Sequence, residues 1–155
     1  MIVKCIADPR GDFPVEEDID EQSWKDSAFL TVGENYVVVS ILFIEGNVWF
    51  AVLEDRFPNI PVTHPASCFQ VLVNQLSEFH YLGDTRSVAG VVPFISYEYY
   101  SQIDIYDNLV DESGRSPFWK LHIEKSRQLY THYQLRYPEL LKPFEERWPD
   151  FAKKD

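Results

Sequence analysis

The sequence predicts an α+β fold, in which a small curled antiparallel sheet is followed by two or three C-terminal helices. Three observations support this prediction. The apolar runs before residue 95 have the length of strands, apolar residues recur at helical spacing from Ser96 onward, and strands do not alternate with helices. The chain has 155 residues, the size of one domain. We therefore expect one domain over residues 1–155, mainly β over 2–95 and mainly α over 96–155.

The first half of the chain contains the clearest strand signals. Residues 2–7 are enriched in Ile and Val and predict an opening strand. Residues 36–44 and 48–53 are almost continuous in β-branched and aromatic residues, and Gly46 between them can adopt a positive φ, so a hairpin with a three-residue connection is expected. Because these strands lack polar alternation, both of their faces should be buried. The intervening residues 8–27 are acidic and contain two prolines, which predicts an exposed loop.

Prolines restrict the strands that follow the hairpin. Three prolines between residues 56 and 66 allow only a short edge strand near residues 60–63. Residues 67–76 fit either a strand or a helical turn, because periodicity does not decide between them. Residues 88–95 have strand character, and Pro93 confines this strand to an edge or to a strand end.

Amphipathic helices are expected in the C-terminal third. A first helix over residues 96–110 has an apolar stripe formed by Tyr99, Ile103, Tyr106 and Val110. Ser116 and Pro117 then fit the N-cap and first position of a second helix. One side of that helix carries Phe118, His122, Ile123, Leu129, Tyr130 and Tyr133. Pro138 ends this helix, and two later prolines allow only short turns.

The charge of the chain is acidic and unevenly distributed. Asp and Glu total 25 against 14 Lys and Arg, which gives a net charge of −11. Residues 97–114 hold five acids and no base, whereas residues 115–155 hold nine bases and six acids. Nucleic acids and anionic membranes attract basic surfaces, so we expect neither as a partner. A basic protein partner suits this charge, and the oligomeric state is left open.

Sequence motifs for nucleotide, metal or nucleophilic chemistry are missing. The six glycines are at least seven positions apart, which excludes GxGxxG and P-loop sequences, and there is no GxSxG sequence. His64 and Cys68 are four residues apart and supply only two of the four ligands of a tetrahedral zinc site. We expect Cys68 to be a small buried residue and His64 a surface loop residue. The sequence therefore predicts no cofactor, no metal and no catalytic residue.

An acidic stripe on the first predicted helix is the candidate binding site. Tyr100, Asp104, Asp107 and Asp111 recur at helical spacing, one residue away from the apolar stripe. Aspartates at these spacings repel one another, and a basic partner would relieve that repulsion. Tyrosine is a frequent anchor of protein interfaces, and charge steers the encounter of two proteins. These four residues are the predicted partner-binding site, and an ordinary acidic solvent face is the alternative.

Signals for secretion or membrane insertion are also missing. Residues 1–8 lack the apolar core and cleavage site of a signal peptide. The longest apolar stretch, residues 37–44, is far shorter than the ~20 residues that span a bilayer. We expect a cytoplasmic protein whose two cysteines, Cys5 and Cys68, are reduced.

Two resemblances extend these predictions. Residues 2–72 resemble, in their layout, a small SH3-like β-barrel of bacterial or phage type. The features that carry this resemblance are Val3-Lys4-Cys5-Ile6, a long acidic loop, residues 30–38, the hairpin, and the segment with Val62, Pro65 and Ser67-Cys68-Phe69. The resemblance covers under half of the chain. The whole chain loosely resembles the bacterial immunity proteins of contact-dependent growth inhibition, which are small, acidic, cytosolic and unlike one another in sequence. That class implies neutralisation of a toxin and transfers no site residue.

The sequence thus predicts a cytosolic immunity protein that binds a basic toxin domain, such as a nuclease, through an acidic and aromatic surface. Two alternatives stay open. The first is a hydrolase that combines a histidine and a carboxylate from distant positions. The second is an adaptor module that grips an extended peptide with Tyr36, Trp49 and Phe50. We expect these three aromatic residues to belong to the core instead, because the hairpin is apolar throughout.

Overall fold

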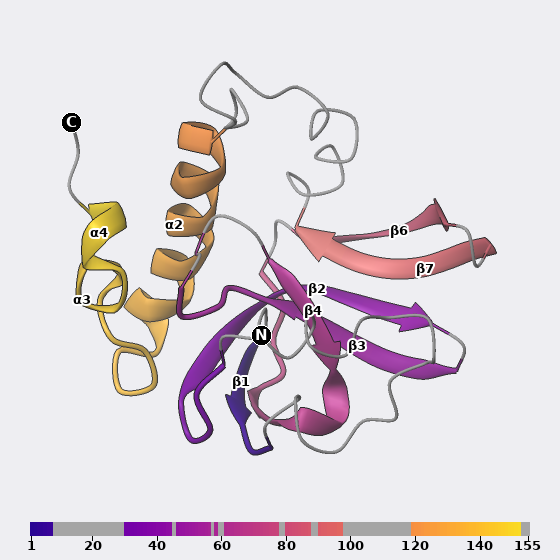
Figure 1. Ribbon diagram of the computed structural model, residues 1–155, viewed down its shortest axis with the longest axis horizontal. Coiled ribbons are helices and arrows are strands. Elements are labelled where there is room, and N and C mark those ends of the chain that lie inside the picture. The colour runs from indigo at the N-terminus through magenta and orange to yellow at the C-terminus, as the bar shows by residue number, and fades with distance from the viewer. Residues whose placement is uncertain are drawn as a thin grey trace.

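The fold is α+β, as the sequence predicts: an antiparallel sheet is followed by C-terminal helices that lie to one side of it (Figure 1). It is seen in a computed structural model that describes residues 1–7, 30–44, 46–56, 58, 61–77, 80–87, 90–97 and 119–152.

Within the described residues, the sheet has seven strands. In chain order they are β1 (Ile2–Cys5), β2 (Asn35–Ile44), β3 (Asn47–Val52), β4 (Val62–Pro65), β5 (Phe69–Val73), β6 (His80–Ser87) and β7 (Gly90–Tyr97). Five of them follow the order β4-β3-β2-β1-β5, and β7 pairs with both β2 and β6. The ten-residue strand β2 has three neighbours. It pairs with β3 on one side, while on the other side β1 pairs with its first residues and β7 with its later ones.

The predicted hairpin is confirmed as β2 and β3. Ile44 pairs with Asn47, so two residues connect the strands and not three. Gly46 has a φ of 79°, a left-handed conformation that favours glycine. The short connection fits the preference of hairpins for two-residue turns.

The predicted strand near residues 60–63 is β4, shifted to Val62–Pro65, and among the described strands it pairs with β3 alone. A 3-10 turn, η1 (Ala66–Cys68), leads from β4 directly into β5. The segment 67–76, for which the sequence allowed either a strand or a helical turn, therefore contains both. No pairing joins β4 to β5 in the part of the chain that the structure describes. The sheet formed by the described strands is therefore not closed, and the predicted SH3-like barrel is not confirmed.

The strand predicted at residues 88–95 is β7. The strand as a whole is not at a sheet edge, but among the described strands Pro93 itself pairs with β6 alone, which is the edge environment expected of a proline. Residues 94–96 of β7 pair with β2 on one side, while its whole length pairs with β6 on the other. Pro93 is tolerated because it lies one residue beyond the pairing with β2, opposite Asp84 of β6. Strand β6 was missed, because its sequence is mixed in polarity and contains Gly83.

The helices at the end of the chain are α2 (Trp119–Arg136), α3 (Phe144–Arg147) and α4 (Pro149–Ala152). The long second predicted helix is confirmed as α2. The two short helices agree with the prolines, because Pro143 directly precedes α3 and Pro149 is the first residue of α4. Ser96 and Tyr97 belong to β7, so the first predicted helix does not begin at Ser96. The rest of that helix, including its apolar stripe, lies outside the described residues.

Two core clusters occupy the two faces of the sheet. The first lies between the sheet and the helices (Figure 1) and contains Ile2, Val37, Val39, Leu53, Leu129, Tyr130, Tyr133, Leu141, Phe144 and Trp148. The second contains Met1, Val3, Cys5, Leu30, Tyr36, Val38, Phe50, Val52, Cys68 and Phe69. Residues 36–39 of β2 alternate between the clusters, which confirms burial on both faces for this part of the strand. The prediction is wrong near the hairpin connection, where Phe43 of β2 and Val48 of β3 are each 40% exposed.

None of the helices in the described ranges is long and apolar enough to cross a membrane.

Candidate functional site

The predicted partner-binding residues, Tyr100, Asp104, Asp107 and Asp111, lie outside the described residues. The polar groups that the structure does bring together are elsewhere, at Glu54 and Asp55. We call this place the Glu54–Asp55 junction. It follows Leu53, a core residue, and its two carboxylates contact three other segments of the chain.

Asp55 binds the C-terminal helices through Arg147 of α3. Nη2 of Arg147 donates to Oδ1 of Asp55 at 2.7 Å, and Nη1 donates to the carbonyl oxygen of Asn35 at 2.6 Å. The arginine side chain is only 8% exposed, against 33% for the aspartate. The guanidinium group also lies over the ring of Tyr36, 4.5 Å from its centroid, which adds a cation–π contact.

The other oxygen of Asp55 binds the turn that precedes β2. Oδ2 accepts hydrogen bonds from the hydroxyl of Tyr36 at 2.6 Å and from Oγ1 of Thr31 at 2.9 Å. The backbone N–H of Thr31 donates to the Tyr36 hydroxyl oxygen at 2.7 Å. Burial, followed by the hydrogen bond to Asp55, raises the pKa of Tyr36, so the phenol keeps its proton and stays a donor.

Glu54 turns into the protein and binds β4. Its Oε1 lies 2.8 Å from Nε2 of His64, and both side chains are 1% exposed. The carbonyl oxygen of Glu54 accepts a hydrogen bond from the indole N–H of Trp148 at 2.9 Å. The expectation that His64 is a surface loop residue is therefore wrong: an interior carboxylate gives the imidazole a partner, which makes its burial tolerable.

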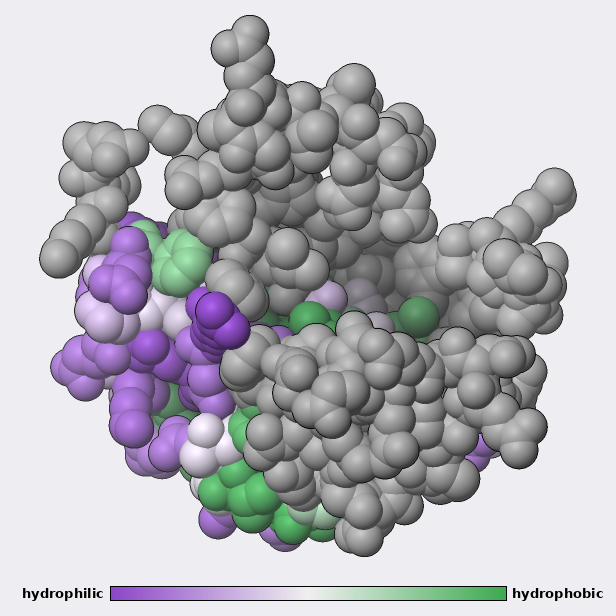
Figure 2. All heavy atoms as spheres, in the orientation of Figure 1, coloured by the Kyte–Doolittle hydropathy of each residue, from purple (hydrophilic) through white to green (hydrophobic). Residues whose placement is uncertain are grey.

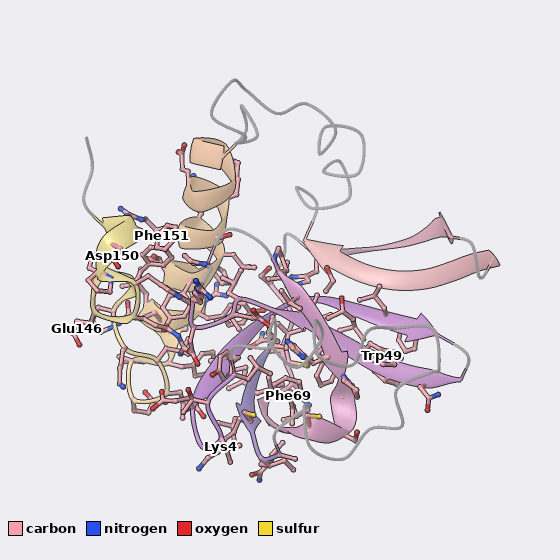
Figure 3. All side chains as sticks on the ribbon, in the orientation of Figure 1. Lys4, Trp49, Phe69, Glu146, Asp150 and Phe151 are labelled. Carbon is pink, nitrogen blue, oxygen red and sulfur yellow. The ribbon has the colours of Figure 1, made fainter. Side chains whose placement is uncertain are left out.

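The Glu54–Asp55 junction connects distant segments of the chain, and its Glu54–His64 pair is not exposed. A histidine next to a buried carboxylate is the pattern that a hydrolase would need, but Glu54 and His64 are both enclosed, so a substrate in water has no contact with them. Of the aromatic residues proposed to grip a peptide, Tyr36 and Phe50 are confirmed as core residues. Trp49, which Figure 3 labels on β3, is only partly buried, so its expected place in the core is not confirmed.

The exposed side of the short helices is acidic, although the segment 115–155 is basic overall. Arg147 is buried against Asp55, and Lys142 lies 3.7 Å from Glu34. Glu146 and Asp150 are exposed, and neither has a basic partner among the described residues. Figure 3 shows Glu146 projecting from α3 away from the sheet, and Figure 2 shows hydrophilic side chains gathered over the C-terminal helices.

A second polar contact of the interior joins Ser77 and His80. Oγ of Ser77 lies 2.7 Å from Nδ1 of His80, at the start of β6. Burial lowers the pKa of His80 to about 4, because the charged imidazolium loses hydration. Ser77 is buried and His80 is partly buried, so this pair attaches the beginning of β6 to the interior.

Metal ligands are not grouped in the described ranges: no cluster of three or more His, Cys, Asp or Glu residues there fits a metal ion. Cys68 is buried, which confirms its expected place as a small core residue.

Sequence reasoning missed the Glu54–Asp55 junction because its partners are distant. Arg147 is 92 residues from Asp55, and Trp148 is 94 residues from Glu54. One local signal was available: two acids directly follow an apolar strand, where a carboxylate must either reach water or find a buried partner.

Comparisons with protein-family models, with curated proteins and with solved structures gave no match to this chain.

Proposed function

We propose that this chain is an immunity protein that binds and neutralises a basic toxin domain, such as a nuclease. The observation that carries the proposal is the arrangement of charge. The chain has a net charge of −11, and its basic C-terminal segment turns Arg147 inward against Asp55 and leaves Glu146 and Asp150 exposed. Arg147 therefore adds little positive charge to the surface of the short helices.

The partner-binding site that we propose is Tyr100, Asp104, Asp107 and Asp111. Within residues 97–114 the sequence has five acids and no base, so compensating charge must come from elsewhere. Three basic side chains of the tail are paired with other acids, since Arg127, Lys142 and Arg147 lie next to Glu145, Glu34 and Asp55. A toxin site that binds RNA or DNA is rich in Lys and Arg and would supply the missing charge.

Electrostatic attraction gives this proposal a mechanism. An acidic surface steers a basic domain toward it and raises the association rate, and the effect weakens as salt increases. Once bound, aspartates can occupy the positions that phosphate groups take in a nuclease, while tyrosine packs against the rim of the cleft.

Co-expression tests the proposal. The toxin domain encoded beside the gene for this chain is expressed in a susceptible bacterium, with and without the chain, and growth is measured. We expect the wild-type chain to restore growth and the variant D104N/D107N/D111N to restore it less. The variant E16Q/E17Q/D18N is the matched control, because it removes the same amount of charge elsewhere and should protect like the wild type.

The proposal fails if no toxin domain is encoded beside the gene, or if the wild-type chain does not restore growth. Equal protection by the wild type and by D104N/D107N/D111N would leave the function standing and remove the proposed site.

A further inference from the structure

We draw no further inference here: the strongest candidate, the exposed apolar residues Ile6, Val32, Val71 and Leu72 at the β1–β5 side of the sheet, carries none because nothing in the structure shows what covers them.

Discussion

Arg147 joins the C-terminal helices to the sheet through several polar contacts. It joins the carboxylate of Asp55, the carbonyl of Asn35 and the ring of Tyr36 while staying almost fully buried. Its charge is compensated by a carboxylate that keeps some contact with water. Such a pair avoids much of the dehydration that weakens fully buried ion pairs.

Replacing Arg147 with alanine should lower the free energy of unfolding by about 2–4 kcal/mol, because hydrogen bonds to charged groups and packing are lost together. Lys142→Ala is the matched control: its pair with Glu34 is long, the lysine is 64% exposed, and its loss should change stability by less than about 0.5 kcal/mol. Urea denaturation measures both. Equal effects of the two substitutions would contradict the role assigned to Arg147.

The buried pair of Glu54 and His64 makes a different prediction. His64→Leu leaves a carboxylate in the interior without its partner and should cost about 3–5 kcal/mol. The double variant E54L/H64L removes both polar groups and should be more stable than H64L alone, because no charge is left buried. Thermal and urea unfolding of the three proteins measure this order. A double variant less stable than H64L would show that the pair is not a buried charge in need of a partner.

His80 predicts a pH dependence. Its pKa is about 4 in the folded protein and 6.5 without perturbation, so between these values the unfolded chain binds more protons. Stability from this residue is complete above about pH 6.5 and is lost as the pH falls toward 4. Between about pH 7 and about pH 5 the wild type should lose roughly 1–2 kcal/mol more than His80→Gln. Identical pH profiles of the two proteins in urea denaturation would contradict a neutral His80 in the folded protein.

At the scale of elements, the β2–β3 hairpin depends on the conformation of Gly46. Its φ is 79°, and a side chain added there meets no atom within 4 Å. Gly46→Ala should therefore cost about 1 kcal/mol through backbone strain alone, and Gly46→Asn should cost less because asparagine tolerates this conformation. Denaturation curves distinguish the two. An asparagine variant as unstable as the alanine variant would argue against strain as the cause.

Elements with a strong local pattern were predictable from the sequence. The apolar runs of β2 and β3, the helix α2 and the proline-limited short helices all follow from periodicity and turn residues. Features set by distant pairing were not. β7 lies between two strands despite Pro93, and His64 is interior only because Glu54 is beside it. No local pattern contains these facts, since tertiary contacts decide them.

The two candidate sites also differ in whether the sequence could predict them. The acidic stripe of Tyr100, Asp104, Asp107 and Asp111 came from helical spacing alone and stays a prediction. The Glu54–Asp55 junction came from the structure alone, because its contacts span 92 and 94 residues of sequence.

At the scale of the whole molecule, charge and core have separate roles. The first apolar cluster and the Glu54–Asp55 junction hold the sheet and the helices together, and the second cluster stabilises the other face of the sheet. The surplus of acid is not needed for that purpose, and a large net charge opposes compactness through self-repulsion. The acidic surplus has a purpose if it speeds the association with a basic partner, which is the proposed function.

The association rate with the toxin domain encoded beside this chain's gene is the most direct test of that proposal. Stopped-flow measurements compare the wild type, D104N/D107N/D111N and the control E16Q/E17Q/D18N at about 50 mM and about 500 mM salt. We expect the wild-type rate at low salt to exceed that of D104N/D107N/D111N by roughly tenfold, and the difference to shrink at high salt. The control should stay close to the wild type. Equal rates and equal salt dependence for all three proteins would contradict a binding site at the aspartates.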